Sequence, residues 1–186
     1  MANTDAPRGF TPIKHLNGTP YTGAVQTIGV ADGEDIFIGD MINLESGLAD
    51  PMATDDAAVL GCVVGVGKNS ELEALKAGAF NPADLTTLYY DDSASTHTDF
   101  FVAYVPADDM IFQVQTNADL DLVVGDNVDL VDGAGNTKTG RSIQEVGTST
   151  NADFVVVEIP QLVDNDNSLA NAEVYVTVTH AEQAFK

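Results

Sequence analysis

The sequence is poor in the residues that support several common chemistries. It contains one cysteine, Cys62, so no disulfide can form within the chain. It contains no tryptophan, and 7 Lys and Arg residues stand against 29 Asp and Glu residues, which gives a formal net charge of −22. A surface of this sign repels phosphate, so we expect no nucleic-acid partner.

Long apolar runs are also missing. The longest ones, around Cys62 and at Val155–Val157, fall far short of the ~20 residues that a membrane-spanning helix needs, so we expect no membrane partner. Residues 1–21 contain no continuous apolar segment, and Pro7 and Pro12 interrupt them further. We therefore expect no secretory signal and a mature protein that begins at Met1.

The composition that is present favours β-structure. Valine (21) outnumbers leucine (13), threonine reaches 17, and the acidic residues are mostly Asp rather than the helix-favouring Glu. The pattern Ser70–Gly78, with Ser70 as N-cap and Glu73 three residues later, predicts one short helix near Glu71–Ala77. We expect an all-β fold, a single β-barrel or β-sandwich domain of roughly ten short strands with this peripheral helix. Strands are predicted at 24–30, 35–38, 41–44, 59–66, 100–105, 110–116, 127–131, 142–147, 154–159 and 174–179.

Residues 1–22 differ from the rest of the chain. They carry Arg8 and Lys14 against Asp5, a net charge of +1, whereas residues 23–186 carry 5 basic and 28 acidic side chains, a net charge of −23. Their prolines and glycines disfavour a helix or a central strand. We therefore expect an extended N-terminal arm (1–22) and a β-rich body (23–186). Whether the arm lies on its own body or on a neighbouring molecule stays open at this point.

One internal echo links the two halves of the body. Residues 38–44 and 124–130 share the pattern apolar-Gly-Asp-x-apolar-x-Leu, 86 residues apart. Gly39 and Gly125 can adopt the positive φ of a tight turn, and the following aspartates can bond to nearby backbone amides. Duplication and independent use of the same turn chemistry explain this similarity equally well.

No motif nominates a catalytic, cofactor-binding or metal site. The histidines at 15, 97 and 180 are scattered, and Cys62 lies in an apolar run where a thiol behaves as a small buried hydrophobe. Asp164–Ser168 resembles the start of a calcium loop, but Leu169 stands where the required glycine would be. The acidic loops could share a weakly held surface cation. We expect no enzyme, no cofactor and no metal centre.

The first eighteen residues read MANTDAPRGFTPIKHLNG. This segment resembles the arm A-N-x-D-A-P-x-G-F-x-P-x-(R/K)-H-L-x-G that opens a family of small capsid decoration, or cement, proteins of tailed bacteriophages. Residues 38–44 and 59–66 are similar to the two strand motifs that follow the arm in that family. Beyond about residue 70 only general β-character remains to compare.

The resemblance implies a structural protein on the outer surface of the phage head, made in the host cytoplasm. It would bridge neighbouring major capsid proteins and stabilise the expanded shell, and it would act as a homo-oligomer, by analogy a trimer. The arm would make the contacts with the capsid or an adjacent subunit. The apolar contacts would be made by Phe10, Ile13, Leu16 and Tyr21. The ionic contacts would be made by Arg8, Lys14 and His15.

Two interpretations from other classes remain open. A head-fibre or carbohydrate-binding module would use the loops 91–99 and 164–172 to hold a glycan of the host surface. An acidic hydrolase would depend on one or two particular carboxylates, which the sequence does not single out.

Overall fold

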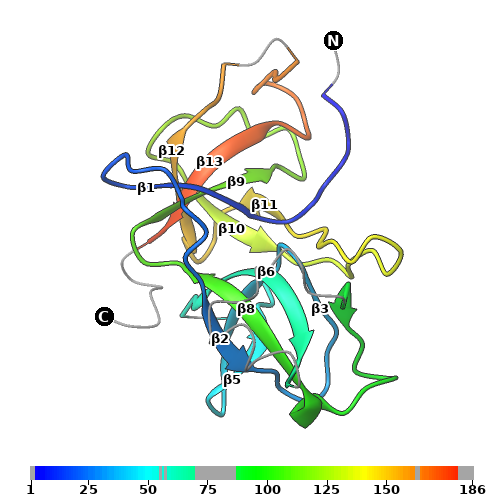
Figure 1. Cartoon of the computed structure of the whole chain (residues 1–186). Coiled ribbons are helices and arrows are strands. Elements are labelled where there is room, and N and C mark those ends of the chain that lie inside the picture. Colours follow the sequence, from blue (N-terminus) through cyan, green and yellow to red (C-terminus); the bar gives the residue numbers. More distant parts are fainter. Residues whose placement is uncertain (1–2, 55, 57, 70–86, 162–163, 180–186) are drawn as a thin grey trace.

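The structure is a computed structural model that describes residues 3–54, 56, 58–69, 87–161 and 164–179 (Figure 1). The strands are β1 (Thr11–His15), β2 (Gln26–Gly29), β3 (Ile36–Phe37), β4 (Met41–Glu45), β5 (Leu48–Pro51), β6 (Gly61–Lys68), β7 (Tyr89–Tyr90), β8 (Phe100–Pro106), β9 (Met110–Gln115), β10 (Asn127–Val131), β11 (Glu145–Thr148), β12 (Phe154–Glu158) and β13 (Glu173–Val178). A 3-10 turn at His97–Asp99 leads into β8.

The described strands form two main sheets, and all their strand pairings are antiparallel. The sheet drawn at the top of Figure 1, here the upper sheet, has the order β1-β9-β13-β12-β10-β11. The lower sheet has the order β2-β8-β6-β4-β5, and β3 and β7 form a separate pair. The first half of the chain after β1 therefore builds the lower sheet, and the second half builds the upper one.

Two clusters of buried apolar side chains stabilise these sheets. The larger cluster takes Met41 and Cys62 from the lower sheet and Phe112 and Phe154 from the upper sheet. The smaller cluster joins the lower sheet to the β3–β7 pair and contains the fully buried Tyr90. Because the larger cluster draws on both sheets, burial of apolar area couples the two halves of the chain.

The two sheets repeat one strand order. The lower sheet reads β2-β8-β6-β4-β5, and the upper sheet reads β9-β13-β12-β10-β11 with β1 added outside β9. The correspondence follows chain order, because β2, β4, β5, β6 and β8 match β9, β10, β11, β12 and β13 in turn. The short β3 and β7 have no counterpart among the described strands of the second half.

The echo in the sequence marks equivalent turns of this repeat. Gly39 and Gly125 have φ values of 101° and 100°. The carboxylates of Asp40 and Asp126 each accept a hydrogen bond from the backbone N–H three residues earlier, at 2.7 and 2.8 Å. Each glycine N–H also donates to the adjacent strand, in both cases at 2.8 Å. Shared turn chemistry alone would not also repeat the strand order, so the echo belongs to a structural repeat.

The predicted all-β class is confirmed, and each of the ten predicted strands overlaps an observed one. The pairings between strands do not close either sheet into a barrel. The sequence did not predict β1, β5 or β7, and the predicted helix at 70–78 lies outside the described residues. Among those residues, no helix has the length and apolar character needed to cross a membrane.

Candidate functional site

The N-terminal arm lies along the molecule's own upper sheet. β1 pairs antiparallel with β9 and forms the edge strand, so the question left open by the sequence is answered for residues 11–15 (Figure 1). Pro12 is compatible with this place because an edge strand can lack an N–H donor on its open side. Upstream of β1, the Asn3 side chain bonds to the backbone of Asp166 and extends the contact.

Phe10 is an internal residue of this fold. Its side chain is 2% exposed, and its ring centroid lies 5.0 Å from that of Phe154 and 6.4 Å from that of Phe112. Its backbone N–H donates to the carbonyl of Gly39. The expectation that Phe10 contacts a capsid or a second subunit therefore needs correction: in this structure the ring is covered by its own core.

The glycine at position 9 is also explained by contacts within the chain. A Cβ at this position would lie 2.4 Å from the carbonyl oxygen of Gly39 and 2.5 Å from the Cβ of Ser142, and the φ of Gly9 is +69°. Only glycine fits such a close approach without a shift of the backbone. The Gly-Phe pair of the arm motif thus anchors the arm to its own body.

The two cations of the arm lie at the surface in ion pairs with the upper sheet. Arg8 contacts Glu173 at 2.8 Å, and Lys14 contacts Glu158 at 2.7 Å. The Lys14 ammonium also lies 5.8 Å from the centroid of the Tyr175 ring. Exposed pairs of this kind each contribute about 0–1 kcal/mol, so a carboxylate of a partner can replace Glu173 or Glu158 at little cost.

The other predicted arm contacts differ in accessibility. Leu16 is 47% exposed, whereas Ile13, His15 and Tyr21 are half-buried. Tyr21 packs against the larger core cluster, and burial raises the pKa of its hydroxyl. His15 and Tyr21 line a shallow groove of about 360 Å³ together with Val25, which leads into β2. Of these four side chains, Leu16 is therefore the most accessible to a partner, and the other three are accessible in part.

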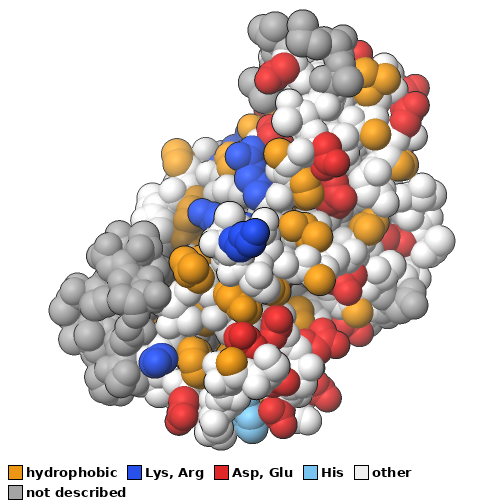
Figure 2. All heavy atoms as spheres, turned by 90° about the vertical axis from the view of Figure 1, so that its right-hand side faces the viewer, with side chains coloured by type: hydrophobic (Ala, Val, Ile, Leu, Met, Phe, Trp, Pro, Cys, Tyr) orange, Lys and Arg blue, Asp and Glu red, His pale blue; other side chains and the backbone are white. Residues whose placement is uncertain are grey.

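A second groove runs along the other side of the arm. It has a volume of about 380 Å³, and its lining includes Pro12, Ile38, Val64, the 55%-exposed Leu88 and Arg141. Within the part of the chain that the structure describes, no carboxylate pairs with Arg141. Figure 2 shows Lys and Arg side chains among hydrophobic ones across the middle of one side of the molecule. This arrangement suits a partner that combines apolar and acidic groups.

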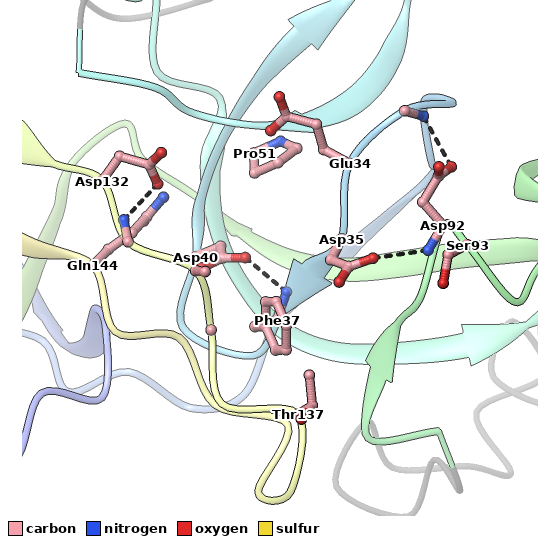
Figure 3. Close-up of a pocket in the computed structure, with 14 residues that line it drawn as sticks. Glu34, Asp35, Phe37, Asp40, Pro51, Asp92, Ser93, Asp132, Thr137 and Gln144 are labelled. Atoms are coloured by element: carbon pink, nitrogen blue, oxygen red, sulfur yellow. Dashed lines mark hydrogen bonds between the residues drawn. The ribbon is translucent and has the colours of Figure 1, made fainter.

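A third hollow, of about 500 Å³, is acidic (Figure 3). No Lys, Arg or His belongs to its described lining. Its carboxylates mostly hold their own backbone: Asp92 accepts from the N–H of Gly33, and Asp35 accepts from the N–H of Asp92. The carboxylates in the lining are Glu34, Asp35, Asp40, Asp92 and Asp132.

Asp40 is the most strongly perturbed carboxyl of this acidic pocket. It is 3% exposed, and burial raises its pKa to about 7, although hydrogen bonds from Ser142 and from the N–H of Phe37 act in the opposite direction. The charge of Asp132 adds to the rise. Asp40 therefore gains a proton near neutral pH. In Figure 3 its carboxylate points to the Phe37 N–H, so its visible role is to hold the turn before β4.

Several further expectations can be compared with the structure. Cys62 is buried as predicted, and its thiol donates to the carbonyl of Phe10 at 3.2 Å. In the calcium-like segment, the Asp166 carboxylate accepts from the hydroxyl and N–H of Ser168. No group of three His, Cys, Asp or Glu within the described residues is arranged to hold a metal ion. His180 lies outside the described residues.

Sequence reasoning missed Asp40 and Arg141 as surface or pocket features. The local pattern predicts Asp40 only as a turn residue, because the Ser142 that bonds to its buried carboxyl stands about one hundred positions away. Arg141 stands between turn residues and carries no local pattern.

No family model matches the chain, and comparisons with curated proteins and with solved structures found no match.

Proposed function

We propose that the chain is a capsid decoration protein of a tailed bacteriophage. It binds the outside of the expanded head, bridges neighbouring major capsid proteins and stabilises the shell. In this proposal the protein is a homotrimer located on the virion. For its body we propose a β-sandwich rather than a single barrel, and the core cluster to which both sheets contribute supports this choice.

The observation that carries the proposal is the arm. Its sequence resembles the family motif, and it lies on an exposed sheet edge where the side chains of Arg8 and Lys14 reach the surface. These cations, with Leu16, give the arm an apolar and basic surface on a chain of net charge −22. Such a surface complements acidic groups of a capsid subunit, and the remaining negative charge keeps decorated particles apart.

The contacts of one copy need not be strong. Exposed ion pairs exchange partners cheaply, and a multivalent oligomer adds the contacts of its arms together. A protein that binds the expanded shell better than the unexpanded one stabilises the expanded state by that difference in affinity. We therefore assign ionic contacts to Arg8, Lys14 and His15 and apolar contacts to Leu16, Ile13 and Tyr21.

The test is co-sedimentation of the purified protein with heads that lack it, followed by heating to find the temperature at which the shells break. Removing the whole arm would also remove Phe10 and β1 from the fold, so point changes at the surface are better. The variant Arg8→Glu/Lys14→Glu/Leu16→Ser keeps Gly9 and Phe10. We expect at least a tenfold loss of bound protein and a lower rupture temperature than with the wild type.

The control is Lys138→Glu, which reverses one exposed charge in the turn before β11 and leaves the arm unchanged. It should bind nearly as well as the wild type. Circular dichroism and denaturation must show that both variants fold. Failure of the folded wild type to bind any such head would overturn the capsid proposal, and full binding by the triple variant would remove the arm from it.

A further inference from the structure

The internal repeat identifies an edge in the lower sheet that lacks the strand its counterpart has. In the upper sheet, β1 covers the outer edge of β9. The counterpart of β9 is β2, which pairs with β8 on its inner side. Its outer side meets a described strand at the C-terminal end, where Val30 bridges Ala49 of β5, and meets none before that. The β2 edge, defined here as residues 24–27, corresponds to the place that β1 occupies in the other half.

The register of the repeat is fixed by two equivalent bridges. Val30 forms a parallel bridge with Ala49, and Thr116, which stands 86 residues after Val30, forms one with Val146. In each case the next residue donates its N–H to the bridged partner, at 2.8 Å in the lower sheet and 3.0 Å in the upper sheet. Residues 24–27 of the β2 edge therefore match residues 110–113, the segment of β9 that pairs with β1.

A bulge confirms this correspondence on the inner side. β6 shifts register against β8 between Val63 and Gly65, and β12 shifts against β13 between Val156 and Glu158. Bulges bend and twist the strands in which they occur. Both halves carry the bulge at the same step of the ladder, so their outer edges are equivalent in geometry as well as in order.

Strand alternation shows which backbone groups this edge presents. Because Ala31 donates outward to Ala49, the period of two directs the N–H and C=O groups of Val25 and Thr27 outward as well. No residue in the described ranges bonds to these groups. An edge of this kind is a template for an added strand.

The surroundings of the edge select the chemistry of that strand. At its start lies the groove of about 360 Å³, whose lining includes Tyr21, Val25, Val105 and Met110 and which suits an apolar side chain. Carboxylates lie at both ends. Asp108 lines the groove, and Asp50 follows the Ala49 that meets β2. Burial and the charges of Glu34 and Glu45 raise the pKa of Asp50 to about 6.

We infer that the β2 edge binds an extended segment of another protein as an added antiparallel strand, and that this segment is basic and carries an apolar side chain for the groove. The chemistry is that of β1, which combines Ile13 with Lys14 and fills the matching place on β9. This inference does not depend on the capsid proposal, because its test uses no capsid.

The probe is a capped synthetic peptide with the sequence of residues 8–17, RGFTPIKHLN, added to the full-length protein. Amide hydrogen exchange is followed by NMR. We expect millimolar peptide to slow exchange at Val25 and Thr27 at least about fivefold, while Gln26 and Ile28 change little because they already face β8. This alternation distinguishes strand addition from general contact with the surface.

Two variants sharpen the test. Thr27→Pro removes an outward N–H at an edge position where proline is tolerated, and should weaken peptide binding about tenfold, whereas Thr27→Ala keeps the N–H and should bind like the wild type. A peptide with glutamate at both basic positions should bind more weakly. The inference is wrong if no protection appears at the β2 edge, if Thr27→Pro binds normally, or if exchange changes instead at Ile111 and Gln113 because the peptide displaces β1.

Discussion

Replacing Phe10 by alanine tests whether the arm is part of the fold of the isolated protein or is available to a partner. The ring is 2% exposed and contacts the rings of Phe154 and Phe112. Truncation of a buried phenylalanine costs about 3–5 kcal/mol, from lost burial and from the cavity that remains. A domain has about 5–15 kcal/mol of stability in all, so Phe10→Ala should remove a large part of it.

The matched variant is Leu16→Ala, because Leu16 belongs to the same arm but is 47% exposed. Its replacement should change the free energy of unfolding by about 0.5 kcal/mol or less. Urea denaturation followed by circular dichroism and by tyrosine fluorescence measures both variants, provided that the two signals change together.

The reasoning about Phe10 fails if Phe10→Ala loses less than about 1 kcal/mol in the isolated protein. In that case the arm would dissociate readily from its own body, and Phe10 would return to the set of residues available to a capsid. A loss near the expected value, with Leu16→Ala unchanged, leaves the exposed residues of the arm as the ones free to bind.

Two other predictions test the buried turn and the close contact of the arm. The raised pKa of Asp40, about 7 against 3.8 for an ordinary Asp, means that the folded state holds more protons than the unfolded state between these values. Stability should therefore fall as pH rises from about 4 to about 7, and Asp40→Asn should flatten this slope in urea denaturation across that range, whereas an equal slope in both proteins would contradict the assignment. Asp126→Asn removes the equivalent turn carboxylate and is the control. Gly9→Ala should destabilise the protein by more than about 2 kcal/mol, because its Cβ meets backbone at 2.4 Å, while Gly18→Ala, with φ +85° and open space around it, should lose about 1 kcal/mol from backbone strain alone. Equal losses in thermal or urea denaturation would show that the contact at Gly9 is not limiting.

The sequence predicted elements whose signals are local. Strands such as β10 and β12 combine a turn with β-branched residues, and their starts agree with the observed ones. β1 escaped prediction because Pro12 argues against a strand unless the strand lies at an edge, and the edge is created by β9, one hundred residues away. β7 is two residues long and has no pattern of useful length, whereas its equally short partner β3 falls within the predicted strand 35–38.

In the candidate site, too, some features could be predicted from the sequence and others could not. The net charge and the opposite sign of the arm follow from counting residues. In the structure Arg8 is exposed, Lys14 is half-buried, and both form ion pairs with the upper sheet. The burial of Phe10 does not follow from counting, because an aromatic residue in a Pro- and Gly-rich segment serves a partner or its own core with the same local pattern. Only Phe112, Phe154 and Gly39, brought together by the two sheets, decide between these roles.

The arm motif therefore carries two kinds of information. Gly9 and Phe10 fix the arm to the body, because one needs the close approach to Gly39 and the other fills a place between two rings. Arg8 and Lys14 stand on either side of these anchors in the sequence and reach the surface, where they form weak, partly exposed ion pairs. An arm built in this way is ordered before it meets a partner, so binding through its outer residues would not require the entropy of ordering a free tail. That preorganisation predicts a small entropy cost for any arm-mediated contact, and it makes the outward residues, rather than the buried aromatic, the places where substitution changes affinity without changing the fold.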